Sequence, residues 1–173
     1  PSNTLCLALP DGTARVMYEK VHPFSFVGED SVFDAGDKLC IIEVGEMRIG
    51  AVICYDLRFP ELYSAIAAYS DVSVTIANWP EKRVGHWRTL LQARAIENQS
   101  YAIGVNRIGR DGNGQDYQKS SMIVSPEGEV LSPIRSHEEM DVYELDSLLV
   151  KRCRDDFPTV RDKRYLLYCK FRA

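Results

Sequence analysis

One strand restricts the possible fold more than any other feature of the sequence. Residues 47–54, MRIGAVIC, lose their polar positions toward the end, so that Cys54 follows a run of small and apolar residues. A continuous apolar run is typical of a strand covered on both faces, whereas a half-exposed strand alternates with polar residues. Residues 59–70, which follow, have a helical pattern with Pro60 in the first turn, where its missing N–H costs nothing. The segment therefore predicts a central, covered strand followed by a helix.

The remaining segments extend this pattern into a mixed sheet. Strands are predicted at 71–78 and 101–107, and the period of residues 84–99 places a second helix between them. Hairpins are predicted near both ends of the chain. The hairpins are 4–9 with 14–19, 38–44 with 47–54, and 120–134; the loops are 20–37 and 108–117; a strand at 140–146, a short helix at 147–156 and a C-terminal tail at 155–173 complete the chain. This order predicts one α/β domain over residues 1–173.

Composition and charge restrict the function classes. A formal net charge of −4 without a Lys/Arg block argues against a general binder of nucleic acid or anionic membranes. No apolar run reaches the roughly 18 residues of a membrane span. The cysteines are odd in number and include no C-x-x-C pair, which favours a reducing cytoplasmic setting over a disulfide framework. The histidines are isolated from one another and from the cysteines, so the sequence predicts no metal site.

Cys54 stands where the central strand stops, within GAVICYDLRFPEL, residues 50–62. At such a turn a side chain stands above the sheet, and the backbone N–H of Tyr55 points toward the same space. This is the geometry of a nucleophile elbow with one donor of an oxyanion hole. A nearby helix N-terminus and a cation are expected to lower the pKa of the thiol. The alternative for any such thiol is a small buried hydrophobe. That interpretation is given to the other cysteines, Cys6, Cys40, Cys153 and Cys169.

A thiol nucleophile needs a partner, and the histidines are poorly placed for this role. Lys20 is the alternative, because it ends the strand predicted at 14–19 among apolar and aromatic neighbours. A lysine fixed there would stabilise both a thiolate and a tetrahedral oxyanion. Taken alone, however, a lysine at a strand end is more often a solvated edge residue.

Several motifs stand in one order along the chain, up to about residue 160. They are YEKVHPF, FDAGD, GAVICYDLRFPEL, NWP and LLQARAIENQSYAIGVNRIGRDGNG. Together they resemble the nitrilase superfamily of carbon–nitrogen hydrolases, and in detail its omega-amidase-like branch, which hydrolyses the side-chain amides of α-keto acids. The resemblance covers the C-terminal two thirds of the family's domain.

The resemblance implies roles for three side chains. Cys54 would be the nucleophile that forms a thioester and releases ammonia, and Lys20 would hold the oxyanion together with the N–H of Tyr55. Family members carry a second glutamate in the loop after the lysine, where Glu29 fits best, because Glu19 points to the opposite face of a strand. The resemblance also implies a four-layer α-β-β-α sandwich that needs no cofactor or metal. Such domains commonly form homodimers through their sheets and C-terminal tail.

The general base of the family has no counterpart in this sequence. It is a glutamate in a segment of about a hundred residues before the matched region, and losing a general base costs about two to four decades in rate. The first 19 residues offer only Asp11, in a hairpin turn, and Glu19. We therefore expect an incomplete domain, completed by preceding residues or by a separate N-terminal chain of the same protein.

The second predicted helix carries polar residues on its apolar face. At 100° per residue, Arg94 and Asn98 fall on the core-facing stripe, with Glu97 at its edge. Arg and Glu are seldom buried unless paired. We expect a buried Arg94–Glu97 pair, or a pairing of either with Asp56 or Arg58, as structural support for the elbow. The alternative is that this end of the helix turns into water.

Two residues at the end of the strand predicted at 71–78 are candidates for substrate binding. Asn78 and Trp79 lie on the rim where α/β sheets place ligands, and they would form the acyl-side wall of a pocket. Arg83 or Arg58 would be available for a substrate carboxylate. Because Arg58 follows the nucleophile so closely, a bracing role is favoured for it.

Three functions remain open from the sequence. The leading one is a thiol-dependent amidase that hydrolyses a small carboxylate-bearing amide, with the omega-amide of an α-keto acid favoured. The second is hydrolysis of a nitrile or an N-carbamoyl compound by the same residues. The third is a non-catalytic scaffold that retains the fold.

Overall fold

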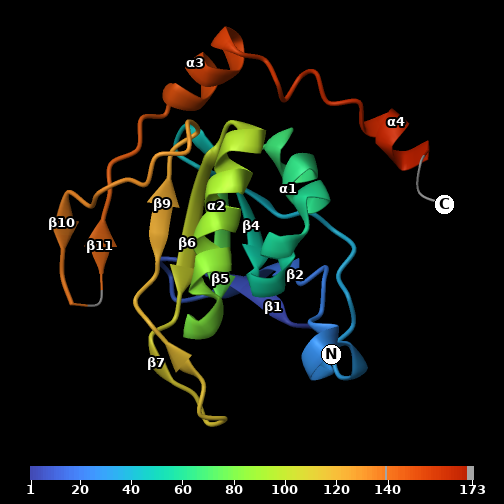
Figure 1. The fold of residues 1–173 in the computed structure, drawn as a ribbon, viewed down its shortest axis with the longest axis vertical. Helices are drawn as coiled ribbons and strands as arrows, with labels where there is room; N and C mark the ends of the chain where they lie inside the picture. Colours follow the sequence, from blue (N-terminus) through green and yellow to red (C-terminus); the bar gives the residue numbers. More distant parts are fainter. Residues whose placement is uncertain (139, 171–173) are drawn as a thin grey trace.

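The computed structural model describes residues 1–138 and 140–170. Its centre is a five-stranded sheet in the order β3-β4-β5-β6-β9 (Figure 1). The strands are β3 (Ile41–Val44), β4 (Met47–Ile53), β5 (Val72–Ala77), β6 (Tyr101–Asn106) and β9 (Met122–Val124). Strands β4, β5 and β6 run parallel, and β3 and β9 pair antiparallel at the two edges. The predicted mixed sheet is therefore confirmed.

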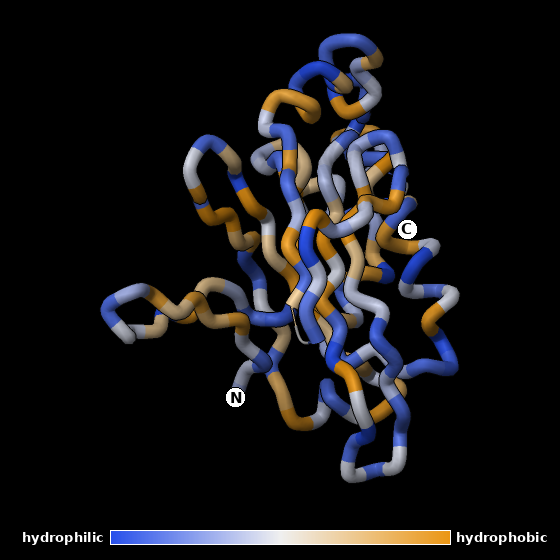
Figure 2. Tube along the Cα trace, turned by 90° about the vertical axis from the view of Figure 1, so that its left-hand side faces the viewer, coloured by the Kyte–Doolittle hydropathy of each residue, from blue (hydrophilic) through white to orange (hydrophobic). Residues whose placement is uncertain are grey.

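Strand β4 is buried on both faces, as its continuous apolar sequence predicts. Ala51, Val52 and Ile53 are only 3%, 0% and 7% exposed. Because successive side chains of a strand point to opposite faces, both sides of β4 at this end must be covered. Figure 2 shows hydrophobic residues along the central strands and hydrophilic residues at the loop tips.

Helices α1 (Pro60–Ala67) and α2 (Val84–Asn98) cover one face of the sheet (Figure 1). Trp87 and Leu91 of α2 are completely buried against β6. Gly104 makes this packing possible, because a Cβ atom there would lie 2.4 Å from Leu91 Cδ1 and 2.6 Å from Trp87 Cζ2. The absence of a side chain thus lets α2 lie directly on β6.

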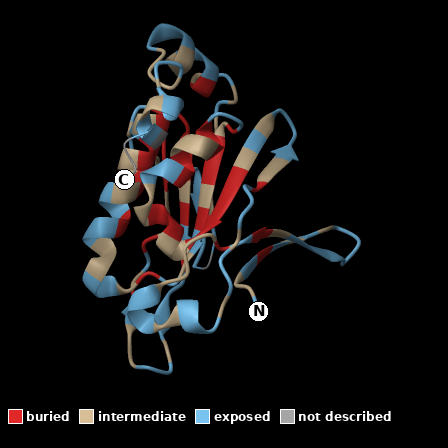
Figure 3. Ribbon diagram, turned by 90° about the vertical axis from the view of Figure 1, so that its right-hand side faces the viewer, coloured by how far each residue is buried: buried red, intermediate tan, exposed pale blue. Residues whose placement is uncertain are grey.

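Strands β1 (Thr4–Ala8) and β2 (Ala14–Glu19) form a hairpin outside the main sheet. The hairpin projects away from the side of the molecule that α1 and α2 cover (Figure 3). Its base is anchored, because Leu5 and Tyr18 belong to the same buried cluster as β4. The loop predicted at 20–37 follows β2 and contains two short 3₁₀ turns, η1 (Ser25–Val27) and η2 (Glu29–Ser31).

The last third of the chain has less strand than the sequence predicts. In the hairpin predicted at 120–134, β9 is followed only by an isolated bridge between Val124 and Val130. The strand predicted at 140–146 is reduced to β11 (Asp141–Val142), which pairs with β10 (Arg135–Ser136). These predictions are wrong in extent because β propensity acts only where a neighbouring strand is available to pair.

Two other segments contain regular structure where none was predicted. The segment 108–117, predicted as a loop, forms a small ladder of β7 (Gly109–Arg110) and β8 (Asp116–Tyr117). The C-terminal tail, which shows no period, contains α4 (Tyr165–Lys170) after the predicted helix α3 (Leu149–Asp156). The side chain of Cys169 lies outside the described part of the structure. None of the described helices is both long enough and apolar enough to cross a membrane.

Candidate active site

Cys54 begins a 3₁₀ turn, η3 (Cys54–Arg58), directly after β4. Ile53 is still extended, with φ −119° and ψ 115°, whereas Cys54 has φ 48°. A positive φ in a residue other than glycine is strained and is common at functional sites. The reversal of the chain at this point matches the sharp strand-to-turn geometry of a nucleophile elbow.

Lys20 and Glu29 form an ion pair in the cavity that Cys54 also lines. This cavity has a volume of about 570 Å³. Lys20 directly follows β2 and is 4% exposed, and its Nζ lies 2.6 Å from Glu29 Oε2. Glu29 also accepts hydrogen bonds from the N–H of Phe24 at 2.7 Å and from Asn3 Nδ2 at 2.8 Å. The structure thus brings together Cys54, Lys20 and Glu29, the three residues that the sequence suggested for catalysis.

The protonation of these groups follows from burial and from their partners. Burial acts to raise the pKa of Glu29, but the hydrogen bonds from Lys20, Asn3 and Phe24 outweigh it and hold that pKa below its ordinary value. For Cys54, burial outweighs the attraction of the Lys20 ammonium and raises the pKa of the thiol. The predicted lowering of the thiol pKa is therefore wrong for this chain, because burial raises it and the negative charge of Glu29 adds to that effect.

One alternative predicted that Asp56 pairs with Arg94 or Glu97. The structure shows neither pairing. Asp56 is completely buried and accepts hydrogen bonds from Tyr18, Ile53 and His22. Sequence reasoning missed His22 in this role, because the histidine is separated from Asp56 by 34 positions. The only local signal was its place two residues after Lys20 in YEKVHPF.

Arg94 braces the elbow through a backbone carbonyl. Its Nε and Nη2 donate hydrogen bonds to the carbonyl oxygen of Leu57 in η3, at 3.1 and 2.8 Å. Its Nη1 lies 3.0 Å from Glu97 Oε1. Arg94 is buried, whereas the Glu97 side chain is 36% exposed, so the expected pair forms at the edge of the core. Asn98 lies on the same stripe and donates from Nδ2 to the carbonyl of Arg94.

Cys54 also lines a second cavity, of about 450 Å³. Asn78 and Trp79 line it, together with Arg58 and Arg83. The Arg58 guanidinium lies 4.8 Å from the centre of the Trp79 ring and makes no hydrogen bond to Arg94 or Glu97. Arg58 is therefore part of the cavity wall, where a cation can meet a bound anion.

Asn106, which sequence reasoning also missed, holds the NWP segment in place. At the end of β6, its Oδ1 accepts from the N–H of Trp79 at 2.7 Å, and its Nδ2 donates to the Trp79 carbonyl at 2.9 Å. The side chain thereby imitates a strand partner for Trp79. Its position at the carboxyl end of a strand adjacent to Asn78 was the available signal.

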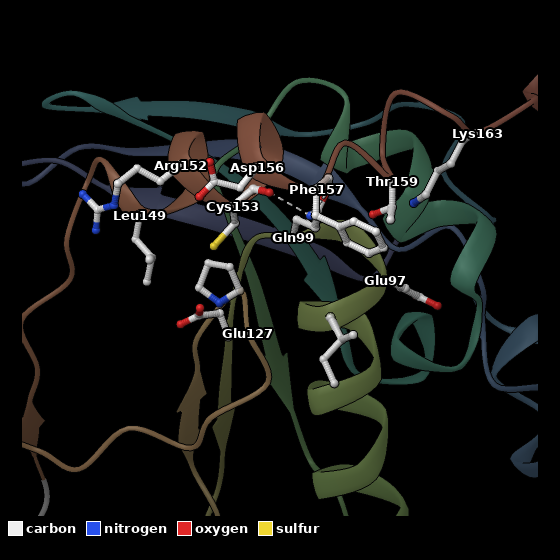
Figure 4. Close-up of a pocket in the computed structure, with 12 residues that line it drawn as sticks. Glu97, Gln99, Glu127, Leu149, Arg152, Cys153, Asp156, Phe157, Thr159 and Lys163 are labelled. Atoms are coloured by element: carbon white, nitrogen blue, oxygen red, sulfur yellow. Dashed lines mark hydrogen bonds between the residues drawn. The ribbon is translucent and has the colours of Figure 1, made fainter.

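A third cavity, of about 610 Å³, lies at the other end of α2, between that helix and α3 (Figure 4). Gln99 donates from Nε2 to the carbonyls of Cys153 and Phe157, at 3.1 and 2.6 Å, and so ties the two helix ends together. The third cavity shares no lining residue with the two cavities at Cys54. We assign no part of the chemistry at Cys54 to it.

The comparison with protein families identifies the family of this chain. The family described as carbon-nitrogen hydrolase matches residues 1–155. The chain belongs to the carbon–nitrogen hydrolase family. The predicted resemblance to the nitrilase superfamily is thereby confirmed, and the relatives described next confirm the resemblance to its omega-amidase-like branch.

The relatives of this chain include proteins that are named as amidases. The chain is 39% identical to the omega-amidase YafV of Escherichia coli (strain B / BL21-DE3) over 161 residues, which are 92% of this chain and 62% of that protein. It is 38% identical to the 2-oxoglutaramate amidase of Paenarthrobacter nicotinovorans over 168 residues, 94% of this chain and 57% of that protein. The chain therefore spans about three fifths of the length of these relatives.

Solved structures of the superfamily have the same fold. XC1258 of Xanthomonas campestris, a CN-hydrolase superfamily protein, superposes with a TM-score of 0.81 at 33% identity, covering 94% of this chain and 63% of that one. The NitFhit protein of C. elegans superposes with a TM-score of 0.79 at 30% identity, over 97% of this chain and 43% of that one. These neighbours support the predicted α-β-β-α sandwich, to which the sheet and the α1–α2 layer belong.

Proposed function

We propose that this chain carries the nucleophile of a thiol-dependent amidase that converts a small carboxylate-bearing amide into an acid and ammonia. The observation that supports it is the joint placement of Cys54, at a strained elbow, with the Lys20–Glu29 ion pair around one cavity. Cys54 Sγ attacks the amide carbon, and the amide nitrogen leaves as ammonia once it has received a proton. Water then hydrolyses the thioester and regenerates the thiol.

The charge of the tetrahedral intermediates requires donors at the elbow. We assign this role to the Lys20 ammonium and to the backbone N–H of Tyr55. Glu29 is a poor general base, because its pKa is held low and both of its oxygens already accept hydrogen bonds. We place the general base on a glutamate outside these residues, in a preceding segment or in a separate N-terminal chain of the same protein.

We infer the substrate class from the residues that line the cavity at Asn78 and Trp79. We assign Asn78 and Trp79 to the acyl-side wall, and Arg58 or Arg83 to the substrate carboxylate. The omega-amide of an α-keto acid fits this arrangement, and two relatives are named omega-amidase and 2-oxoglutaramate amidase. We further propose that the protein is cytoplasmic and forms a homodimer; sedimentation of the purified protein would test the dimer, and cell fractionation would test the location.

Ammonia release tests the proposal directly. The protein, with any companion chain that copurifies, is supplied with 2-oxoglutaramate, with the matching nitrile and with an N-carbamoyl analogue. We expect release from the amide, its loss in Cys54→Ala, and its retention in the control Cys153→Ala. Unchanged turnover in Cys54→Ala would exclude this mechanism, and faster turnover of the nitrile would favour the second function.

The raised pKa of the Cys54 thiol favours one other candidate, a non-catalytic scaffold. A scaffold would release no ammonia from any of the three compounds, with or without a companion chain. Its Cys54 would also react with an alkylating agent no faster at any pH than an ordinary buried thiol.

A further inference from the structure

A buried carboxylate behind Cys54 binds three segments of the chain at once. Asp56 Oδ2 accepts hydrogen bonds from Tyr18 Oη at 2.9 Å and from the N–H of Ile53 at 3.0 Å. Asp56 Oδ1 accepts from the N–H of His22 at 3.0 Å and lies 2.9 Å from the Nδ1 of the same residue. Because a carboxylate accepts hydrogen bonds, Nδ1 is the histidine nitrogen that carries the proton here.

These donors bracket the two residues to which we assign the chemistry. Tyr18 and His22 stand two positions before and after Lys20, and Ile53 directly precedes Cys54. Asp56 therefore connects the chain on both sides of the lysine with the strand end that carries the thiol. Its contacts fix the two residues relative to each other without touching the space in front of the thiol.

The imidazole of His22 is held in one orientation. Its ring is stacked on Phe59, with centroids 3.7 Å apart and planes inclined by 7°. Phe59 directly follows η3, so the stacking partner belongs to the elbow itself. In the part of the chain that the structure describes, His22 is the one residue of the loop 21–28 whose side chain hydrogen-bonds to the elbow.

We propose that His22 is a positioning residue, whose Nδ1–H bond to Asp56 holds the Lys20 loop against the elbow so that the ammonium faces Cys54. The inference rests on the proposed function for its meaning in catalysis. Its physical basis is that a misplacement of about 1 Å at a catalytic group can cost on the order of a hundredfold in rate.

Three variants separate the hydrogen bond from the bulk of the ring. His22→Asn retains an N–H near the position of Nδ1, His22→Gln carries its N–H near the position of Nε2, and His22→Leu has none. The rate at which iodoacetamide alkylates Cys54 is measured in each folded chain by peptide mass, from about pH 7 to pH 10. The buried Cys40 serves as an internal control, because it reacts only if the fold opens.

With Cys40 protected, we expect Cys54 to react about tenfold more slowly in His22→Leu and His22→Gln, and within about threefold of the parent in His22→Asn. Its pH profile should move to higher pH in the two slow variants, since the Lys20 ammonium no longer stabilises the thiolate. Equal rates in all variants would overturn the proposal, as would a His22→Asn variant as slow as His22→Leu. If His22→Leu exposes Cys40, the proposal is tested by His22→Asn and His22→Gln alone: Cys54 must react more slowly in His22→Gln than in His22→Asn.

Ammonia release separates this inference from the proposed function. In an active protein, His22→Leu should lower kcat about tenfold with KM within about twofold, because the substrate pocket is untouched. A larger change in KM than in kcat would contradict a positioning role. If the parent releases no ammonia, the amidase proposal fails, whereas the alkylation rates still decide whether His22 positions Lys20.

Discussion

The Nζ of Lys20 and the Oε2 of Glu29 lie 2.6 Å apart in an ion pair beside Cys54, in which Lys20 is buried and Glu29 is partly exposed. The two charges act on the thiol with opposite signs: the ammonium favours the thiolate and the carboxylate opposes it. Lysine side chains are seldom buried this deeply unless they are paired, and Lys20 is 4% exposed. Glu29 thus provides a partner for the cation in the cavity, and its charge cancels part of the effect of Lys20 on the thiol.

Opposite effects on thiol reactivity are therefore expected from changes to the two partners. Lys20→Met should slow the alkylation of Cys54 at pH 8, and Glu29→Gln should accelerate it, each by about three- to tenfold. Ammonia release should fall in both variants. Asp30→Asn, an exposed acid next to Glu29, is the matched control and should change neither rate. If the alkylation rate changed in the same direction in both variants, the two charges would not act on the thiol with opposite signs.

The pH dependence of the thiol gives a second test. Burial raises the pKa of Cys54, so the thiol is protonated at neutral pH and its alkylation rate should rise with pH. The midpoint is expected above the ordinary thiol value of about 8.5. At neutral pH, Cys54 should not react much faster than the exposed Cys6. A midpoint below about pH 8 would mean that Lys20 outweighs burial.

The Arg94 brace predicts a loss of stability that is separable from its ion pair. Arg94→Met leaves the buried carbonyl of Leu57 without its two donors and should lower the free energy of unfolding by about 3 kcal/mol. Glu97→Gln removes only a partly exposed charge, and less than about 1 kcal/mol is expected. Urea denaturation measures both. Equal losses in the two variants would place the stabilisation in the ion pair instead.

A pair of glycine substitutions tests the packing of α2 on the sheet. Gly104→Ala places a Cβ atom against Leu91 and Trp87 and should lower the free energy of unfolding by about 1–3 kcal/mol. Gly85, in the first turn of α2, has open space around it, so Gly85→Ala should leave stability unchanged or raise it by up to about 1 kcal/mol. Thermal unfolding followed by circular dichroism checks both. A neutral Gly104→Ala would mean that α2 can shift on the sheet.

Local patterns predicted the parts of the fold that depend on near neighbours. The strand before Cys54 follows from its continuous apolar run. The two helices over the sheet and the polar stripe of Arg94 and Asn98 follow from hydrophobic period, because period reports which side of an element is covered. The same patterns overestimated strand after residue 120, where pairing depends on segments that periodicity does not reveal.

The sequence by itself determined which residues could carry chemistry: a thiol at a strand end, a lysine after another strand, a glutamate in the loop that follows, and motifs specific enough to assign the family. Only the tertiary structure decided how those residues behave. Two partners of Asp56, His22 and Tyr18, come from positions 34 and 38 residues away, and Arg58 lies over Trp79. The pKa of Cys54 rises because burial outweighs a cation that is already paired, and burial is a property of the packed molecule, not of any one segment.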